Sequence, residues 1–360
     1  MYFFVDPMGY KNLSVYDISL LNNIDLKLEY YTNFNFEYTI AVPTYKIYSY
    51  SEKTGINKLI SYTLSQLRLL KNIKKKKPVL VHFQWLKLPW LDIILLKILK
   101  RSAIKTVLTA HNLLPHDSGN KFYKVYKKIY NSVDQIIVHE ENSARELVEK
   151  FSIPTKKINI IPHGLISLAT TNQSDVKNIS NKLIEELNLN NKTIYSFLGG
   201  IGHYKGIDLV IKAWNKISDS TKHLIIAGKG GGTYLNELVD KDNVTLINRF
   251  LSNEEFEAFL EVSDYILLPY RRISQSGVLL SALKKRKKII TTNQGGLTEP
   301  LKFGKIGYVL DELSEAELLR VIELAHSEKF EVNTLTWKRI EEYYDWKKIG
   351  EQTKMLYLSL

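Results

Sequence analysis

Short apolar runs alternate with longer segments of helical periodicity over the first half of the 360-residue chain. The runs that predict strands are Tyr2–Val5, Lys27–Tyr31, Pro78–Gln84, Lys105–Ala110, Gln135–His139 and Ile158–Ile161. The segments that predict helices are Asn57–Asn72, Trp90–Lys100, Phe122–Ser132 and Asn142–Lys150. Short strands alternating with helices of this length are typical of a parallel, doubly wound α/β sheet.

The alternation stops at residues 165–191, which are polar and carry no strand pattern, so we expect a linker there. Beyond it, strands are predicted at Thr193–Leu198, His223–Ala227, Val244–Ile247, Tyr265–Leu268, Lys288–Thr292 and Tyr308–Leu310. Helices are predicted at Gly206–Ile217, Thr233–Val239, Asn253–Glu261, Val278–Lys285 and Ser314–Ser327, followed by one or two helices in the aromatic tail, residues 335–360. We therefore expect two Rossmann-like α/β domains, residues 1–164 and 192–334, that face each other across a ligand-binding cleft.

Composition restricts the class of protein. Hydrophobic residues make up 44% and charged residues 24%, a balance typical of globular proteins. The absence of cysteine excludes disulfides, thiolate metal sites and a cysteine nucleophile. Asp6 and Pro7 interrupt the first apolar run, and the stretch from Trp85 to Leu99 is short and charged, so we expect neither a signal peptide nor a membrane span. A soluble, cytoplasmic protein is the resulting expectation.

The formal net charge of +12 favours anionic partners, although Lys, Asn, Ile and Tyr are abundant throughout, as in chains from AT-rich genomes. No nucleic-acid-binding motif is present, so nucleic acid is not an expected partner. A lysine run at residues 74–77 and the amphipathic helix predicted at Trp90–Lys100 are consistent with peripheral binding to an anionic membrane surface. The alternative is a buried helix beside a solvated lysine run.

The glycine-rich turn from Gly199 to Gly206 carries the clearest chemistry. It follows a predicted strand and precedes a helix, with Lys205 beside the helix start. Glycines allow close backbone approach, and the amides at the helix start and the ammonium group would face an anion. A diphosphate fits this pattern, and a tight turn with a solvated lysine is the alternative.

Two other predicted turns follow strands of the same domain. Thr292–Glu299 contains paired glycines whose amides would bind phosphate or a sugar hydroxyl, and Glu299 would accept from sugar hydroxyls. Ser276 and Gly277 stand where a helix is predicted to begin, so their amides would point at a ligand. The glycine run at residues 228–232 lacks dinucleotide spacing and is interpreted as a flexible turn. Asp240 and Asp242 are interpreted as solvated charge rather than a metal site.

In the first domain, the strand ending at Ala110 leads into His111. This histidine would face the cleft and act as either a donor or an acceptor of hydrogen bonds. A structural histidine bonded to a loop carbonyl is the alternative. His116 lies five positions after His111, on the other side of Pro115. Two histidines without further ligands do not suggest a zinc site. The loop after the first strand, with Gly9 and Tyr10, is expected to open onto the same cleft.

Together these pieces resemble the GT-B glycosyltransferases, specifically the large retaining family 4, over nearly the whole chain. The resemblance rests on the order and spacing of Gly9–Asn12, Thr109–Asn112 with Pro115–His116, Ile161–Gly164, Tyr204–Gly206, Pro269–Tyr270 with Ser274–Gly277, and Gly295–Glu299. It implies a nucleotide diphosphate sugar bound mainly by the second domain and a glycan or lipid-linked acceptor held by the first. It also implies final helices that cross back to the first domain, and transfer without a metal or other cofactor.

The resemblance assigns roles to individual residues. Lys205 binds the diphosphate and His111 lies near the reacting sugar, so these two are the predicted catalytic residues. The predicted donor contacts are Gly200, Gly202, His203, Arg249, Arg271, Arg272, Ser276, Gly277, Gly295, Gly296, Leu297 and Glu299. The predicted acceptor contacts are Gly9, Tyr10, Asn12 and His116.

The chain departs from the family pattern at two places. Glycine stands at position 200, where the family commonly has an arginine, and two glutamates that commonly lie between Ile273 and Ser281 are missing. We expect His203, Arg271 or Arg272 to supply replacement charge. The predicted function is transfer of a hexose or deoxyhexose in bacterial capsule, exopolysaccharide or O-antigen synthesis, on the inner face of the membrane. The alternative is a degenerate GT-B domain that binds glycan or acts as a scaffold.

Overall fold

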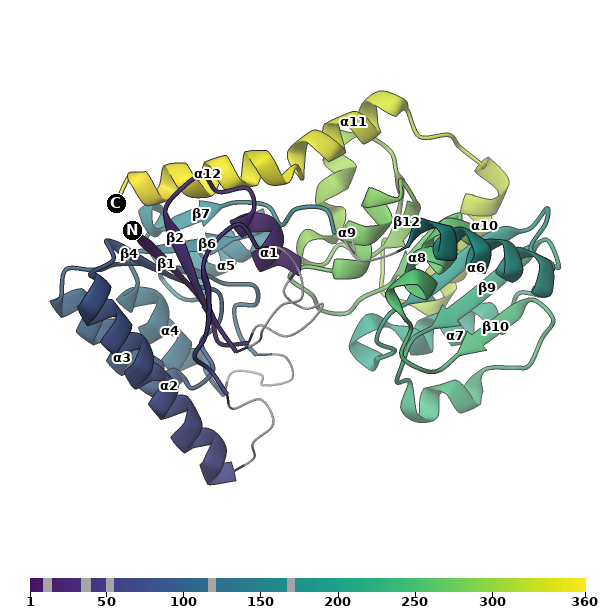
Figure 1. The fold of residues 1–360 in the computed structure, drawn as a ribbon. Coiled ribbons are helices and arrows are strands. Elements are labelled where there is room, and N and C mark those ends of the chain that lie inside the picture. The colour runs from purple at the N-terminus through teal and green to yellow at the C-terminus, as the bar shows by residue number, and fades with distance from the viewer. Residues whose placement is uncertain (9–14, 34–39, 50–54, 116–120, 167–171) are drawn as a thin grey trace. The chain divides into compact units, whose positions relative to one another are not determined.

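The computed structural model describes residues 1–8, 15–33, 40–49, 55–115, 121–166 and 172–360. The chain divides into two compact units, the first made of Met1–Gly164 with Tyr344–Leu360 and the second of Leu165–Tyr343. Each unit contains one parallel sheet with helices on both faces (Figure 1). The fold class predicted from the alternating pattern is therefore confirmed.

The first unit has a seven-stranded sheet in the order β3-β2-β1-β4-β5-β6-β7. Its strands are β1 (Tyr2–Asp6), β2 (Leu28–Thr32), β3 (Thr44–Lys46), β4 (Leu80–Phe83), β5 (Lys105–Thr109), β6 (Gln135–Val138) and β7 (Ile158–Ile160). Its helices are α1 (Val15–Leu21), α2 (Gly55–Lys76), α3 (Pro89–Arg101), α4 (Tyr123–Ser132), α5 (Glu141–Glu149), the short η2 (Thr155–Lys157) and α12 (Trp346–Leu358). The order of the strands reverses between β1 and β4.

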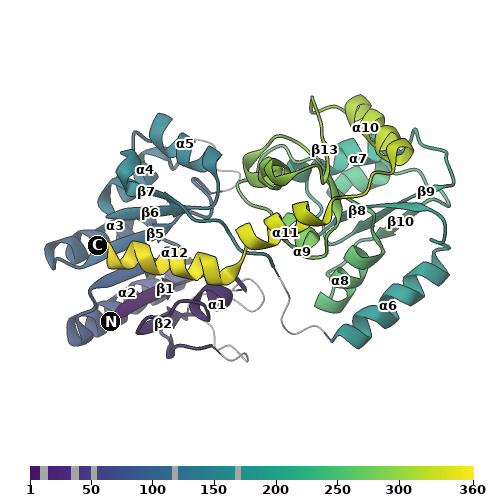
Figure 2. The same cartoon turned by 90° about the horizontal axis from the view of Figure 1, so that it is seen from above.

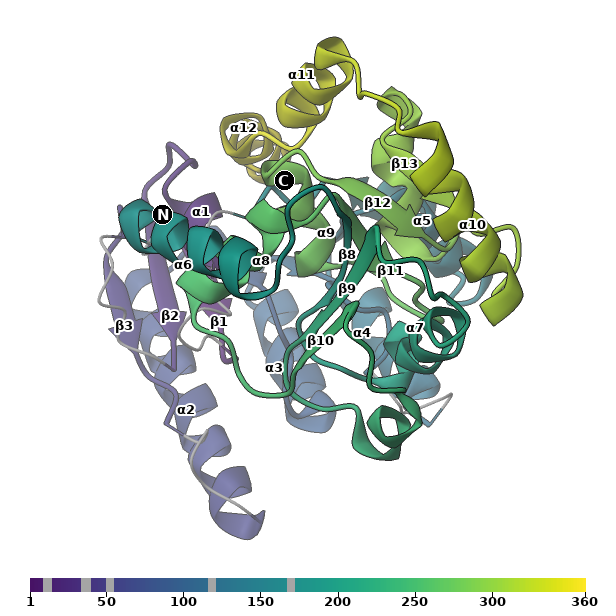
Figure 3. The ribbon, with the colours of Figure 1, turned by 90° about the vertical axis from the view of Figure 1, so that its right-hand side faces the viewer.

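The second unit has a six-stranded sheet in the order β10-β9-β8-β11-β12-β13. Its strands are β8 (Thr193–Leu198), β9 (Lys222–Ala227), β10 (Val244–Ile247), β11 (Tyr265–Leu268), β12 (Lys288–Thr291) and β13 (Gly307–Val309). Its helices are α6 (Gln173–Glu186), α7 (Ile207–Trp214), α8 (Asn253–Val262), α9 (Gly277–Lys284), α10 (Glu315–Glu328), α11 (Thr334–Tyr343) and the 3₁₀ segments η3 (His203–Lys205), η4 (Gly232–Glu237) and η5 (Gly295–Phe303). Figure 3 shows α7 and α10 on one face of this sheet and α6 and α8 on the other.

Alternate residues of the central strands enter different cores. In β1, Phe3 and Val5 pack with residues of α2, α3 and α5, whereas Phe4 packs with residues of α1 and α12. Because both faces are covered, β1 has three consecutive buried apolar residues, Phe3, Phe4 and Val5, rather than apolar residues alternating with exposed polar ones. The return of α12 to the first unit completes its second core and is visible along the sheet in Figure 2.

The prediction of a linker over residues 165–191 was wrong for its middle part, because residues Gln173–Glu186 form α6, which packs against α8. Only Val176 and Ser180 of this helix are buried, which explains why its sequence carries so weak an apolar pattern. The sequence also gave no sign of β3, whose three residues are exposed at the sheet edge. No helix in the described ranges combines the length and apolar character that a membrane span requires.

Candidate functional site

The glycine-rich turn after β8 lies where the strand order of the second sheet reverses, between β8 and β11. Gly199 and Gly206 both have left-handed backbone conformations, with φ of 86° and 77°. A Cβ at Gly206 would lie only 2.2 Å from the carbonyl oxygen of Pro269, so glycine is required at this position. The turn is thus placed at the strand ends where open α/β sheets bind ligands.

Lys205 ends the 3₁₀ turn η3, and only 8% of its surface is exposed. Its Nζ lies 5.5 Å from the ring centroid of Tyr270, and no carboxylate of the described residues forms an ion pair with it. Burial lowers the pKa of Lys205 to about 8. A buried ammonium group without a carboxylate partner is costly to the fold, and an anionic ligand would compensate it.

The loop after β11 leads into α9 as the sequence predicted. Ser276 is the N-cap, and its Oγ accepts a hydrogen bond from the backbone amide of Leu279 at 3.3 Å. Gly277 is the first residue of the helix, and β11 lies next to β8 in the sheet. The positive end of α9 and Lys205 therefore belong to the ends of adjacent strands.

Paired glycines of the third turn pack tightly against this loop. A Cβ at Gly295, whose φ is 52°, would lie 2.0 Å from the carbonyl oxygen of Ile273. The amide of Gly296 donates to the carbonyl of Ser274, and that of Leu297 donates to the carbonyl of Gln294. The structure thus brings the second and third predicted turns together, but it gives these two amides partners within the protein.

Glu299, the predicted acceptor of sugar hydroxyls, has a largely buried carboxylate. Its Oε1 accepts hydrogen bonds from Lys302 Nζ at 2.8 Å and from the Tyr343 hydroxyl at 2.7 Å. Its Oε2 is buried and has no hydrogen-bond partner among the described residues. Oε1 of Glu299 therefore has partners within the protein, whereas Oε2 is a buried acceptor without a partner among the described residues.

The arginines predicted to contact the donor differ in their surroundings. Arg271 forms a bidentate pair with Asp208, with N–O distances of 2.7 and 2.6 Å, and also donates to the carbonyl of His203. Its charge is thus compensated within the protein. Arg272 is exposed, and Arg249, which follows the edge strand β10, is paired with Glu255.

The remaining predicted donor residues, Gly200, Gly202 and His203, lie in the turn that follows β8. The His203 imidazole is exposed and stacks on Tyr234 at 5.3 Å between ring centroids. Gly200 is exposed and a Cβ there would meet nothing within 4 Å, whereas a Cβ at Gly202 would contact the ring of Tyr204 at 3.1 Å. An arginine at position 200 would therefore fit this backbone.

Sequence reasoning missed the role of the glycine run after β9. A Cβ at Gly228 would lie 1.8 Å from the carbonyl oxygen of Gly199, and one at Gly230 would lie 2.3 Å from that of Ile201. The amide of Gly231 also donates to the Ile201 carbonyl at 2.7 Å. These glycines support the turn after β8, so their interpretation as a merely flexible turn was wrong. Their position at the end of the neighbouring strand was the available signal.

In the first unit, His111 follows β5 and is held by two side chains. Its Nε2 lies 2.9 Å from Gln84 Oε1, and its Nδ1 lies 3.1 Å from His139 Nε2. The indole of Trp85 stacks on its ring, with 4.8 Å between centroids. Burial, and then the neighbouring histidines, hold the pKa of His111 well below its usual value.

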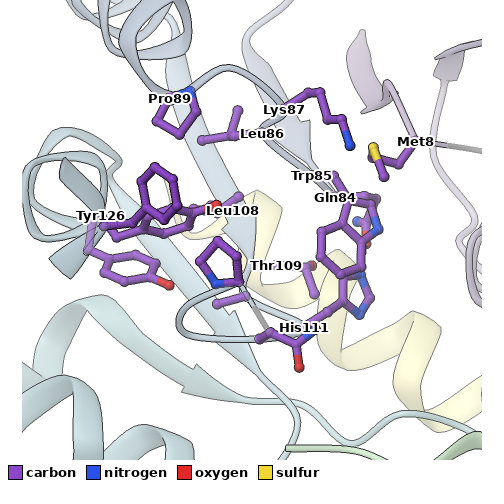
Figure 4. Close-up of a pocket in the computed structure, with 15 residues that line it drawn as sticks. Met8, Gln84, Trp85, Leu86, Lys87, Pro89, Leu108, Thr109, His111 and Tyr126 are labelled. Carbon is purple, nitrogen blue, oxygen red and sulfur yellow. The ribbon is translucent and has the colours of Figure 1, made fainter. Parts of the chain in front are cut away.

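A cavity of about 420 Å³ in the first unit has His111 in its wall. The lining is mostly apolar and includes Trp85, Leu86, Phe122 and Tyr126, with Lys87 beside them. Figure 4 shows Trp85 and His111 side by side, with Leu86 and Tyr126 across the cavity. A cavity of this size and chemistry accommodates an organic ligand with an apolar part.

The predicted acceptor contacts Gly9, Tyr10, Asn12 and His116 lie outside the described residues. In the described part of the chain, no group of three or more His, Asp or Glu side chains is arranged to hold a metal ion.

Comparison with known proteins gives two family matches. Residues 35–166 match the model of Glycosyltransferase Family 4, and residues 192–326 match that of Glycosyl transferases group 1. Spore coat protein SA of Bacillus subtilis is 24% identical over 251 residues, which cover 63% of this chain and 65% of that protein. The N-acetylgalactosamine-N,N'-diacetylbacillosaminyl-diphospho-undecaprenol 4-alpha-N-acetylgalactosaminyltransferase of Campylobacter jejuni is 29% identical over 136 residues, 38% of this chain and 32% of the relative. The matches thus span less than two thirds of these curated relatives.

Solved structures are similar over the whole chain. Sucrose-phosphate synthase from Thermosynechococcus elongatus has a TM-score of 0.76 at 16% identity, with 100% of this chain and 98% of that chain covered. Anabaena Alr3699/HepE in complex with UDP-glucose has a TM-score of 0.75 at 16% identity, with coverage of 100% and 99%. At these identities the likeness establishes the two-domain GT-B fold.

Proposed function

Because the chain belongs to family 4 of the GT-B glycosyltransferases, we propose that it transfers a hexose or deoxyhexose from a nucleotide diphosphate sugar to a glycan acceptor with retention of configuration. The observation that carries this proposal is Lys205, a buried cation without a carboxylate partner among the described residues, at the reversal point of the second sheet. A diphosphate supplies the negative charge that this position lacks.

The donor is proposed to bind to the second unit. Its diphosphate would contact Lys205 and the N-terminus of α9 at Gly277. Glu299, whose buried Oε2 has no hydrogen-bond partner among the described residues, would accept from a sugar hydroxyl once donor binding uncovers it. Anabaena Alr3699/HepE forms a complex with UDP-glucose, which makes a UDP-hexose the first donor to test.

In the proposed reaction, the bond between the anomeric carbon and the diphosphate oxygen breaks, and an acceptor hydroxyl bonds to that carbon from the same face. The hydroxyl proton passes to the leaving diphosphate. Negative charge develops on the diphosphate oxygen as the bond breaks, and the ammonium group of Lys205 stabilises it. Lysine and helix amides supply this stabilisation here, and we therefore propose that transfer needs no metal ion.

The acceptor is proposed to bind to the first unit, with His111 near the reacting sugar. The apolar cavity beside His111 suits an acceptor that carries an apolar part, which a free sugar lacks. The name of the Campylobacter relative specifies a diphospho-undecaprenol acceptor, which supports a lipid-linked glycan as the substrate class. We place the activity in the synthesis of a bacterial surface polysaccharide.

A lipid-linked acceptor requires access to a membrane, and α2 offers a surface for it. The apolar side chains Ile56, Leu59, Ile60, Leu64 and Leu67 are all exposed and share one face of α2 at helical spacing. The helix contains no acidic residue, and Lys71, Lys74 and Lys75 continue the face toward its end. We propose that this face, rather than the lysine run alone, contacts anionic lipid headgroups. Within Trp90–Lys100, the structure exposes Trp90 and Ile94 but buries Leu95.

The experiment that tests the proposal is a screen of UDP, GDP and dTDP sugars for binding and for transfer or hydrolysis, beginning with UDP-glucose. We expect Lys205→Met to weaken donor binding about tenfold to hundredfold, because it removes a charge-assisted contact. Lys229→Met is the matched control, since Lys229 is an exposed lysine in the next loop of the same unit.

Equal donor affinity in wild type and Lys205→Met would contradict the proposed site. Binding without transfer or hydrolysis of any donor would instead favour the alternative function, a glycan-binding or scaffold subunit.

A further inference from the structure

Four of the eight histidines of the chain lie together in the first unit, and the proposed function uses only one of them. The ring centroids of His111 and His139 are 5.0 Å apart, and those of His139 and His163 are 5.5 Å apart. His82 approaches the group through Gln84. The contacts of His139 are those that bear on the reaction.

His139 makes one hydrogen bond with each ring nitrogen. Its Nδ1 lies 2.9 Å from the backbone carbonyl oxygen of Ile161, and its Nε2 lies 3.1 Å from His111 Nδ1. The side chain is almost completely buried, and burial lowers its pKa to about 3, so the imidazole is neutral at neutral pH. A carbonyl oxygen only accepts hydrogen bonds, so the proton of neutral His139 is on Nδ1 and Nε2 carries a lone pair.

This arrangement fixes the proton of the neighbouring ring. Because His139 Nε2 accepts, the hydrogen in its bond with His111 belongs to His111 Nδ1. When His111 is neutral, its Nε2 is then the nitrogen with the lone pair. That nitrogen faces the Gln84 amide, and both side chains line the cavity proposed for the acceptor.

The Gln84 amide can serve either protonation state of His111. As placed, it presents Oε1 to His111 Nε2 at 2.9 Å, which suits a protonated ring, and its Nε2 lies 3.1 Å from His82 Nε2. A 180° turn of the amide presents the NH₂ group to His111 and suits the neutral ring. His139 accepts from His111 in both states and is therefore the fixed end of the chain of hydrogen bonds.

We propose that His139 is a positioning residue for glycosyl transfer: it keeps the proton of His111 on Nδ1, so that Nε2 carries the lone pair and accepts from a hydroxyl group of the bound sugar that takes the place of the Gln84 amide. The inference rests on the proposed function in so far as His111 is taken to contact the sugar. The tautomer of His111, by contrast, is a property of the free protein and can be measured without any substrate.

Two substitutions separate the two bonds of His139. An asparagine amide reaches about as far as the imidazole Nδ1, so His139→Asn keeps a donor for Ile161 but offers nothing to His111. A glutamine amide reaches about as far as Nε2, so His139→Gln can accept from His111 through its oxygen. His163→Asn is the control, because His163 bonds to the carbonyl of Gly164 and not to His111.

The test combines the nitrogen NMR spectrum of the histidine rings with steady-state kinetics of transfer. We expect His111 to carry its proton on Nδ1 in wild type, His139→Gln and His163→Asn, but not in His139→Asn. We further expect His139→Asn to lower kcat at least about tenfold with donor KM little changed, and His139→Gln to restore most of it. Melting temperatures identify a variant that fails to fold.

The inference is overturned if His139→Asn keeps the Nδ1 proton on His111, or if the Asn and Gln variants lose kcat equally. Absence of transfer by the wild type would refute the proposed function instead, and the NMR comparison would still decide the role of His139.

Discussion

The hydroxyl of Tyr357 in α12 is hydrogen-bonded to Nδ1 of His82 in β4, and both side chains are buried. The Nε2 of His82 contacts Thr109 Oγ1 at 2.7 Å and the Gln84 amide at 3.1 Å. Gln84 in turn contacts His111. The C-terminal helix is thus joined to the candidate acceptor site by consecutive hydrogen bonds rather than by apolar packing alone.

Tyr357→Phe is expected to lower the free energy of unfolding of the first unit by about 1–3 kcal/mol, because it leaves the buried Nδ1 of His82 without its partner. Urea unfolding followed by circular dichroism measures this loss. Tyr123→Phe is the matched control, since it removes an exposed hydroxyl that bonds to the carbonyl of Lys150 and should cost less than about 0.5 kcal/mol. A loss as small in Tyr357→Phe as in the control would contradict the importance of this bond.

The features that were predicted correctly from the sequence are those that depend on a local pattern of residues. Apolar runs predicted strands in both sheets, and glycines beside Lys205 at a strand end predicted the turn that the structure places at the sheet reversal. Ser276 before an apolar helical run predicted the cap of α9. Each of these features is carried by residues that are close together in the chain.

The sequence could not predict what depends on pairing across the chain. His111 meets His139 because β5 and β6 pair with Thr109 opposite Ile137, a register that no local pattern specifies. Arg271 looked available for the donor because Asp208, its partner, lies 63 residues earlier. Helix α6 was missed because two buried residues give almost no amphipathic pattern.

Lys205 is expected to make donor binding depend on pH. Burial lowers its pKa to about 8 in the free protein, so at higher pH the ammonium group loses the charge that would meet the diphosphate. We expect the affinity for UDP to fall above pH 8, approaching about tenfold for each pH unit. Calorimetry across this range measures the effect, which Lys205→Met should abolish and Lys229→Met should preserve.

The same burial has the opposite consequence for stability. The pKa of Lys205 is about 8 in the folded protein and about 10.4 in the unfolded chain, so folding disfavours the charged form below pH 8. Stability should therefore rise as pH increases from about 8 to about 10.4, where the unfolded chain still holds the proton that the folded protein has lost. At pH 7 we expect Lys205→Met to be more stable than wild type by about 1–3 kcal/mol in urea unfolding. A variant that is less stable at pH 7 would show that Lys205 already has a compensating partner.

The pair between Arg271 and Asp208 is expected to hold the turn that carries Lys205. Burial of Asp208 opposes ionisation, but the hydrogen bonds and charge of Arg271 outweigh it, and the pKa of Asp208 lies below its usual value. Arg271→Ala removes the bidentate partner of this carboxylate, leaving His203 Nε2 at 3.9 Å, and also removes the bond to the His203 carbonyl, which should cost about 2 kcal/mol. Arg272→Ala, at an exposed position, is the control.

A double-mutant cycle separates the pair from its surroundings. Adding Asp208→Asn to Arg271→Ala should recover about 1 kcal/mol, because the unpaired charge is then gone. Strictly additive losses would argue against a stabilising pair. Donor affinity in Arg271→Ala then shows whether the turn, rather than direct contact with the arginine, governs binding.

The exposed face of α2 is expected to bind anionic membranes. Leu64 and Leu67 are about half exposed, at 49% and 56%, on a helix without acidic residues, so insertion of these side chains and attraction of the neighbouring lysines act together. In flotation with vesicles of equal parts phosphatidylglycerol and phosphatidylcholine, the wild-type protein should float. It should float less with phosphatidylcholine alone or at high salt.

The double substitution Leu64→Glu with Leu67→Glu should leave the protein in the bottom fraction. Val148→Glu, at a partly exposed position on α5, is the control and should float like wild type. Equal flotation of both variants would reject the surface, and loss of a concentration-dependent dimer in the α2 variant would assign the face to a second copy of the chain instead.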